Sequence, residues 1–330
     1  MNLKKLIQLL IFLSIGLFLV WFSVKDLNKE ERSLIWSSLS GVNGWAVMAM
    51  FFIATLSHVA RAVRWKIIAG EETEGVSVAD YFFAIMGGYL ANLAIPRLGE
   101  VTRCGLLNRY RKADFSKMLG TVLFERLFDV LCLGIVFLLT LAMEYKVFYP
   151  YALEQFINPL RQMLSPGILV VLLCGTAIGI MAVVFVMRRT MHAEHPLLVI
   201  LNRFLKGLTG VMNLKKPGAF VLWTILIWFL YWAGIIAGYY AMESFDGLNW
   251  GSGLSLLIGG TIAMIVVQGG IGAYPYFISQ ILLLYSVAKP TGIAFGWLGW
   301  LIQTLVVLLW GFLAFLYFAV NKLPNEDAKS

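Results

Sequence analysis

The chain has 330 residues, of which 60% are hydrophobic and only 13% are charged, and its mean hydropathy is +0.82. Soluble domains carry about 25% charged residues, so this composition excludes a soluble globular protein and predicts an all-α integral membrane protein. The net charge of +8 is compatible with an anionic membrane surface, and we expect phospholipid rather than nucleic acid as the partner.

Six stretches are long and apolar enough to cross the membrane as helices. Each has about 20 mostly apolar residues, the length that spans about 30 Å of hydrocarbon. They are residues 6–24, 44–63, 119–143, 167–187, 219–242 and 292–320. The first follows the basic sequence MNLKK without a small-residue cleavage site, so we interpret it as a retained helix rather than a secretory signal.

Two further apolar segments, 79–103 and 251–287, are interrupted by glycine and proline. We expect the breaks at Pro96 and Gly99 in the first segment, and in the second at Gly269, Gly270, Gly272 and Pro275. Paired interrupted segments are typical of inverted-topology repeats whose re-entrant helices meet near the bilayer midplane. The alternative is two kinked spans, because Gly and Pro are common in membrane helices.

The predicted architecture is a polytopic helical bundle with about six full spans and two re-entrant segments related as an inverted repeat. We expect a single domain over residues 1–330, with a first half at 6–143 and a second half at 167–320. Residues 144–166 and 188–218 are the connecting segments.

The distribution of basic residues predicts the orientation of this bundle. If neither broken segment crosses and the N-terminus is cytoplasmic, 19 of the 26 Lys and Arg residues fall on the cytoplasmic side, 6 fall outside and Arg126 lies within a span. Basic side chains favour the cytoplasmic ends of spans. The first broken segment is therefore expected to enter from the cytoplasm and the second from outside.

The sequence FERLFDV places Glu125, Arg126 and Asp129 within an apolar helix. Charges at membrane depth are costly, and they nearly always face a bundle interior or a watery cavity. These three groups carry a formal charge of minus one, so we expect a further cation from Arg61, Arg97 or Arg103. Two alternatives stay open: a structural ion-pair network in which Arg126 and Asp129 pair, and the acid and base of an enzyme.

The sequence PRLGEVTR places Arg97, Glu100 and Arg103 three residues apart, close to one helical face. Its Pro and Gly break would free backbone amides that suit an anion, whereas the alternative is a solvated cytoplasmic loop. In SHVARAVRW, Arg61 shares a face with an aromatic anchor, and Arg64 is offset from that face and expected to meet lipid headgroups.

These motifs resemble the lysylphosphatidylglycerol synthase transmembrane (flippase-like) family. The resemblance covers roughly residues 8 to 320 and is carried by PRLGEVTR, by the basic stretch NRYRKADFSKMLG, by FERLFD and by the late QGGIGAYP. It implies a bacterial cytoplasmic (inner) membrane protein that moves aminoacylated or anionic phospholipid between leaflets. In multiple peptide resistance factors of this family, a separate soluble domain performs the aminoacylation.

Two departures from the family pattern affect the expected function. The sequence ends at Ser330 just after the last span, so we expect no synthase domain and no enzymatic activity. In many relatives an acidic residue soon follows the Gly-Gly-Ile-Gly run, whereas this chain has Ala273, Tyr274 and Pro275. Gln268, Tyr274 and Tyr276 are the candidate substitutes for that acid.

The sequence thus predicts a membrane lipid translocase with no catalytic residues, metal or cofactor. The residues expected to bind lipid are Arg61, Arg97, Glu100, Arg103, Glu125, Arg126, Asp129, Gln268 and Tyr274. No GxxxxGK[ST] loop is present, so a gradient, the membrane potential or the lipid imbalance would drive transport. The alternatives are a scaffold or regulator that binds lipid or a separate lipid-modifying enzyme, and a membrane-embedded lipid enzyme. A homo-oligomer is compatible with the sequence.

Overall fold

The computed structural model describes residues 17–25, 27–73, 75–95, 98–154, 214–245 and 247–321, with the isolated residues 14, 158, 175 and 181. The regular structure within these ranges is helical, which confirms the predicted all-α class. The chain divides into two compact units, one of residues 1–140 with 214–330 and one of residues 141–213. Most of the predicted connecting segment 188–218 and nearly all of the predicted span 167–187 lie outside the described residues.

Three helices in the described part of the chain are long and apolar enough to cross a membrane: α3 (Gly44–Ala69), α11 (Pro217–Tyr239) and α14 (Lys289–Val320). A fourth membrane-crossing segment is obtained if α6 (Phe115–Met143) and α7 are counted together as one span. All four overlap predicted spans. Of the predicted span 6–24, residues 17–24 are described and helical.

The helix ends follow from local capping signals. In α3, the Asn43 side chain accepts a hydrogen bond from the Trp45 amide. Ser77 and Asp80 form a reciprocal capping box at the start of α4 (Val78–Ala94), and the Asn249 side chain caps α12 (Trp250–Val266). Such side chains satisfy amides that the first helical turn leaves without partners.

The first broken segment forms α4 and α5 (Leu98–Arg111), and the second forms α12, the short η5 (Gln268–Gly270) and α13 (Ala273–Leu284). Gly269, Gly270 and Gly272 all have φ between 68° and 75°, a region that favours glycine, and they form the second break. Pro275 is instead a buried residue inside the first turn of α13. Pro96, one of the expected residues of the first break, lies outside the described residues.

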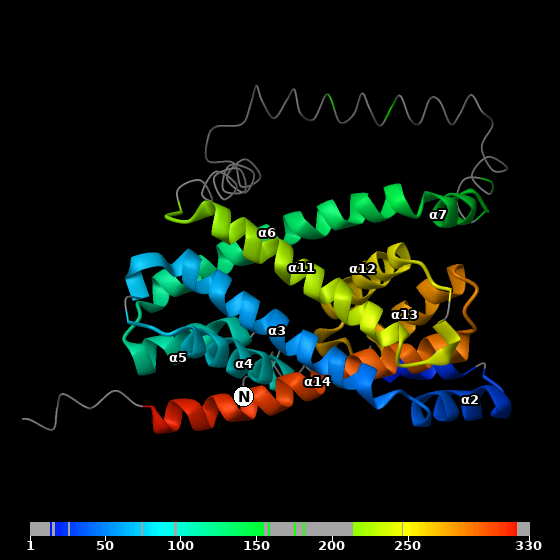
Figure 1. The fold of residues 1–330 in the computed structure, drawn as a ribbon, viewed down its shortest axis with the longest axis horizontal. Helices are drawn as coiled ribbons and strands as arrows, with labels where there is room; N and C mark the ends of the chain where they lie inside the picture. The colour runs from blue at the N-terminus through cyan, green and yellow to red at the C-terminus, as the bar shows by residue number, and fades with distance from the viewer. Residues whose placement is uncertain are drawn as a thin grey trace, which may run out of the picture. The chain divides into compact units, whose positions relative to one another are not determined.

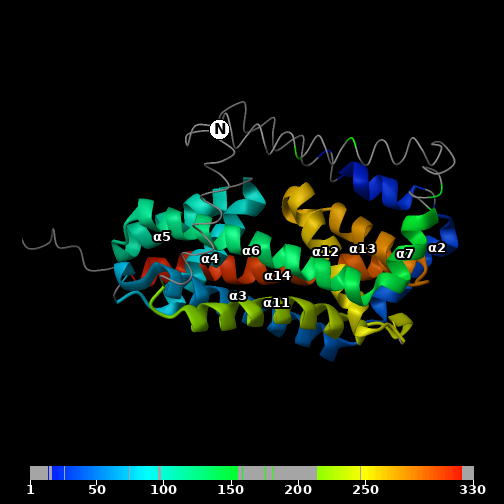
Figure 2. The same cartoon turned by 90° about the horizontal axis from the view of Figure 1, so that it is seen from above.

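The order of helix lengths is repeated along the chain. A long helix, two short helices and a long helix occur as α3, α4, α5 and α6, and again as α11, α12, α13 and α14. In the larger unit, α4 and α5 lie at the end where α3 finishes, and α12 and α13 lie at the opposite end, where α11 finishes (Figures 1 and 2). The two broken segments therefore enter the bundle from opposite ends.

The end of α4 meets the second break inside the larger unit. α4 packs against η5, and the Leu93 side chain lies 3.8 Å from the position of a Cβ added to Gly269. The Trp300 indole on α14 also donates a hydrogen bond of 2.7 Å to the Gly269 carbonyl. The interrupted ends of the half-helices thus face each other against α14.

Buried apolar side chains form one cluster at each end of this unit. One cluster joins the first half of α3 to α12, α13 and the first half of α14. The other joins the second half of α3 to α4, α5 and the end of α14.

The remaining described elements are α2 (Lys29–Ser40), η1 (Gly70–Thr73) and η4 (Glu243–Phe245). In the smaller unit, α7 (Tyr145–Ala152) includes Pro150.

Gly99 was expected to be part of the first break, but it is the second residue of α5. Its amide donates a hydrogen bond of 2.6 Å to the Asn92 side chain, and its Cα packs against the backbone of Gly88 on α4. A Cβ on Gly99 would collide with the Gly88 carbonyl oxygen and the Asn92 amide. The glycine is therefore needed for the close approach of α4 and α5, rather than for a turn.

We predict that Gly99→Ala destabilises the protein by about 1–3 kcal/mol, because the new methyl group meets a backbone atom that cannot rotate away. Gly105→Ala on the same helix is the matched control, because a Cβ there has no neighbour within 4 Å. The midpoint of thermal unfolding in detergent measures both. Equal midpoints for the two variants would contradict the packing role.

Candidate functional site

A buried cluster of five charged side chains lies where α3, α5, α6 and α11 approach one another. Its members are Arg61 and Arg64 from α3, Arg103 from α5, and Glu125 and Asp129 from α6. We call these five residues the charge cluster. Because its members come from three separate helices, it depends on the tertiary fold.

Glu125 is the centre of the charge cluster and is 0% exposed. Its Oε1 accepts hydrogen bonds from Arg61 Nη1 at 3.0 Å and Arg64 Nη2 at 3.2 Å. Its Oε2 accepts one from Arg103 Nη1 at 3.0 Å. Three guanidinium groups on one carboxylate offset the large cost of burying that charge.

Asp129 lies one helical turn after Glu125 and extends the cluster toward α11. Its Oδ1 accepts a hydrogen bond of 2.7 Å from Arg64 Nη2, and its Oδ2 lies 3.2 Å from Arg61 Nη2. Arg61 also donates to the Tyr231 hydroxyl at 2.9 Å, and Arg64 donates to Thr224 Oγ1 at 3.4 Å. Tyr231 and Thr224 connect the cluster to α11.

Aromatic rings cover two of the guanidinium groups. The Arg103 guanidinium carbon lies 4.7 Å from the centre of the Trp65 ring, and that of Arg64 lies 5.9 Å from the Phe220 ring. A desolvated cation over an aromatic face gains roughly 2 kcal/mol. The Trp65 indole donates to Thr121 at 2.8 Å, so it also connects α3 to α6.

Arg126 does not pair with Asp129, a pairing that the sequence left open as an alternative. Its Nε donates to Glu100 Oε1 on α5 at 3.1 Å, and the two side chains are 38% and 36% exposed. Arg126 is one residue after Glu125 and is therefore turned about 100° around α6, toward α5 rather than toward α3. The Glu100–Arg126 pair forms the exposed edge beside the buried Arg103–Glu125 pair.

Arg64 is the main residue that the sequence reasoning misplaced. It was expected at the lipid headgroups, but it is 0% exposed and contacts both carboxylates of the cluster. The sequence did carry a signal for its position, because Arg64 lies three residues after Arg61 and residues at this spacing are neighbours on a helix surface. Tyr231 and Thr224 were not expected either, and their spacing in α11 carries no comparable signal.

The other sequence candidates lie away from this cluster or outside the described residues. Arg97 and the Gln268 side chain are not described. Tyr274 is buried in the apolar cluster of the other end of the bundle, where its ring packs against Gly260 on α12 and Gly299 on α14. The structure thus brings Arg61, Arg103, Glu125 and Asp129 together and places Tyr274 in a core.

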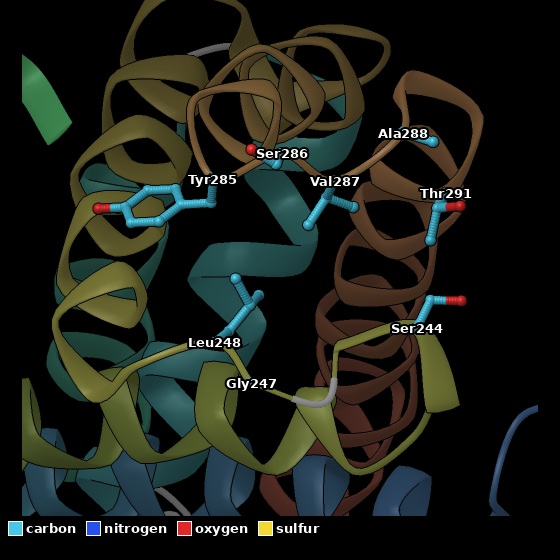
Figure 3. A pocket seen from close by; sticks show the side chains of 8 residues that line it. All are labelled: Ser244, Gly247, Leu248, Tyr285, Ser286, Val287, Ala288 and Thr291. Carbon is cyan, nitrogen blue, oxygen red and sulfur yellow. The ribbon is translucent and has the colours of Figure 1, made fainter. Parts of the chain in front are cut away.

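A pocket of about 420 Å³ lies at the end of the bundle that holds α12 and α13. Figure 3 shows it between the loop before α12 and the turn from α13 to α14, with Tyr285 and Leu248 on opposite sides. Its lining residues are Ser244, Gly247, Leu248, Tyr285, Ser286, Val287, Ala288 and Thr291. All are uncharged, so this pocket is chemically distinct from the charge cluster.

Comparison with known proteins identifies a family. The profile of a family described as "Lysylphosphatidylglycerol synthase TM region" matches residues 6–311, which includes every residue of the charge cluster and both breaks. Neither the search of curated proteins nor the search of solved structures found a match.

Proposed function

Because the chain belongs to the lysylphosphatidylglycerol synthase TM-region family, we propose that it is a multi-pass membrane protein that binds a phospholipid and moves it between leaflets. The observation that carries this proposal is the charge cluster: three buried arginines gather within reach of two carboxylates. Ionisable groups at membrane depth mark substrate paths by default. Guanidinium groups are suited to phosphate because they donate two parallel hydrogen bonds.

The helix arrangement supports an inverted repeat as the transport framework. The order of helix lengths recurs, the broken segments enter from opposite ends, and Leu93 near the end of α4 lies beside Gly269 of the second break. In transporters with inverted repeats, discontinuous helices form the substrate site near the midplane, and one repeat rocks against the other. We propose that α4 with α5 and α12 with α13 are the two moving elements.

We place the protein in the bacterial inner membrane with a cytoplasmic N-terminus, on the distribution of basic residues. We also propose that it is not an enzyme, since its family is described as a transmembrane region and arginines hold both carboxylates of the cluster. A general acid or base must exchange a proton directly with its substrate, and the ion pairs with arginine compete with that exchange.

A leaflet-specific lipid assay tests the proposed function. Full-length protein in vesicles with fluorescent phospholipid analogues should expose inner-leaflet lipid to an external quencher faster than protein-free vesicles do. An unrelated membrane protein at equal density controls for leakage. If folded protein moves no lipid above these backgrounds across anionic, aminoacyl and polyprenyl lipids, the translocase proposal fails. The ion pairs of the charge cluster then favour a scaffold in which they only hold the helices together.

A further inference from the structure

The charge cluster has an unequal number of positive and negative groups. Arg61, Arg64 and Arg103 contribute three positive charges, while Glu125 and Asp129 contribute two negative charges. The adjoining Glu100–Arg126 pair is neutral. The described residues that contact one another here therefore carry a net charge of plus one, mostly shielded from solvent.

Among the described residues, Arg103 is the member of this cluster with two buried donors that lack a hydrogen-bond partner, whereas Arg61, Arg64 and Asp129 each have one such buried atom, Nε, Nε and Oδ2. The Nη1 of Arg103 donates to Glu125, but its Nε and Nη2 have no hydrogen-bond partner within the part of the chain that the structure describes. The side chain is only 2% exposed, so water does not replace the missing partner freely. Buried donors without partners are costly and rare in native proteins.

The geometry of the unused atoms points to a particular ligand. Nε and Nη2 lie on the same edge of the guanidinium plane, so their N–H bonds point in the same direction. Such an edge matches two oxygens of a phosphate or carboxylate. A phosphodiester has two free oxygens and one negative charge, so it would satisfy both the unused edge and the net charge of the cluster.

We propose that the unused edge of Arg103 binds one phosphodiester group, so that the cargo is an anionic phospholipid without a cationic headgroup. This inference rests on the proposed translocase function and specifies its substrate class. A lysyl-type headgroup would bring two ammonium groups toward a cluster that is already positive, and like charges at short range in a low dielectric repel strongly. The Glu100–Arg126 pair is the proposed point of entry, because it is the exposed neighbour of Arg103.

The test compares lipids of different headgroup charge on the wild-type protein. The full chain is placed in phosphatidylcholine nanodiscs with increasing phosphatidylglycerol or lysylphosphatidylglycerol, and the thermal midpoint is followed as the measure of binding. Phosphatidylglycerol should raise the thermal midpoint at about a tenfold lower mole fraction than lysylphosphatidylglycerol does. This difference corresponds to about 1.4 kcal/mol in binding free energy. Equal or stronger binding of lysylphosphatidylglycerol would overturn the inference.

A second arm separates a lipid headgroup from free phosphate. Inorganic phosphate, added at millimolar concentration to nanodiscs of phosphatidylcholine alone, should leave the midpoint unchanged. If it stabilises the protein while phosphatidylglycerol does not, the site binds a soluble anion and the lipid assignment is wrong.

Two variants connect the lipid preference to the cluster. Glu125→Gln raises the net charge to plus two and should tighten phosphatidylglycerol binding about tenfold. If that variant does not fold, Glu100→Gln at the exposed edge should tighten binding in the same direction by a smaller factor. Weaker phosphatidylglycerol binding by a folded Glu100→Gln variant would count against the inference.

The failure of this inference is distinguishable from failure of the proposed function. Transport of lysylphosphatidylglycerol with no preference for phosphatidylglycerol refutes the substrate class alone. Binding of phosphatidylglycerol without movement of any lipid refutes translocation and leaves the anion site in place.

Discussion

Replacement of Arg64 by leucine is expected to destabilise the protein by about 3–5 kcal/mol, the cost of breaking a buried ion pair on one side. Arg64 is 0% exposed and donates to both Glu125 and Asp129. Its loss leaves two carboxylates opposite only Arg61 and Arg103. The midpoint of thermal unfolding in detergent should fall by about 5 °C or more.

Arg109→Leu is the control for this experiment, because Arg109 is an exposed arginine of α5 whose described contact is with the ring of Tyr110. The midpoint of thermal unfolding of the Arg109→Leu variant should stay close to that of the wild type. A double-mutant cycle with Asp129→Asn isolates the pair, and its coupling energy should reach about 1–3 kcal/mol. Additive effects would show that Arg64 and Asp129 do not stabilise each other.

The apolar spans were predictable because membrane-crossing helices need long apolar runs, whatever their neighbours are. The predicted segments 44–63, 219–242 and 292–320 correspond to α3, α11 and α14. The second break was predictable for a local reason, since Gly269, Gly270 and Gly272 adopt conformations that favour glycine. Gly99 shows the limit, because its role depends on a neighbouring helix that the local sequence does not identify.

The pairing within the charge cluster was harder to predict than its existence. FERLFDV indicated buried charges and the need for a further cation, and pairing of Arg126 with Asp129 was left open as an alternative. In the fold, Arg126 pairs with Glu100, while Asp129 pairs with the arginines of α3. Each helix presents more than one face to its neighbours, so the partner of a charge is decided by helix packing. Arg64 was misplaced for the same reason, because α3 is covered on a wider face than the one containing Arg61 and Trp65.

The second large effect is expected on lipid movement when Arg103 becomes glutamine. Arg103 both holds Glu125 and provides the unused edge proposed to bind phosphate. Glutamine retains some hydrogen-bonding capacity, but it lacks the positive charge and the two parallel N–H donors of the guanidinium edge. We expect the rate of phosphatidylglycerol movement in vesicles to fall about tenfold or more, the consequence of losing a charge-assisted hydrogen bond of roughly 1.5–3 kcal/mol.

Arg103→Lys separates charge from geometry in this experiment. Lysine preserves the positive charge, yet it cannot present two parallel donors, so its rate should lie between those of the wild type and Arg103→Gln. The thermal midpoint of each variant is measured on the same preparation, and Arg109→Gln on the same helix is the control. If Arg103 only holds α5 against α6, transport should fall in proportion to the loss of folded protein, and lysine should restore both together. A folded Arg103→Gln variant that moves phosphatidylglycerol at the wild-type rate would exclude Arg103 from the lipid path and would leave the charge cluster a structural role.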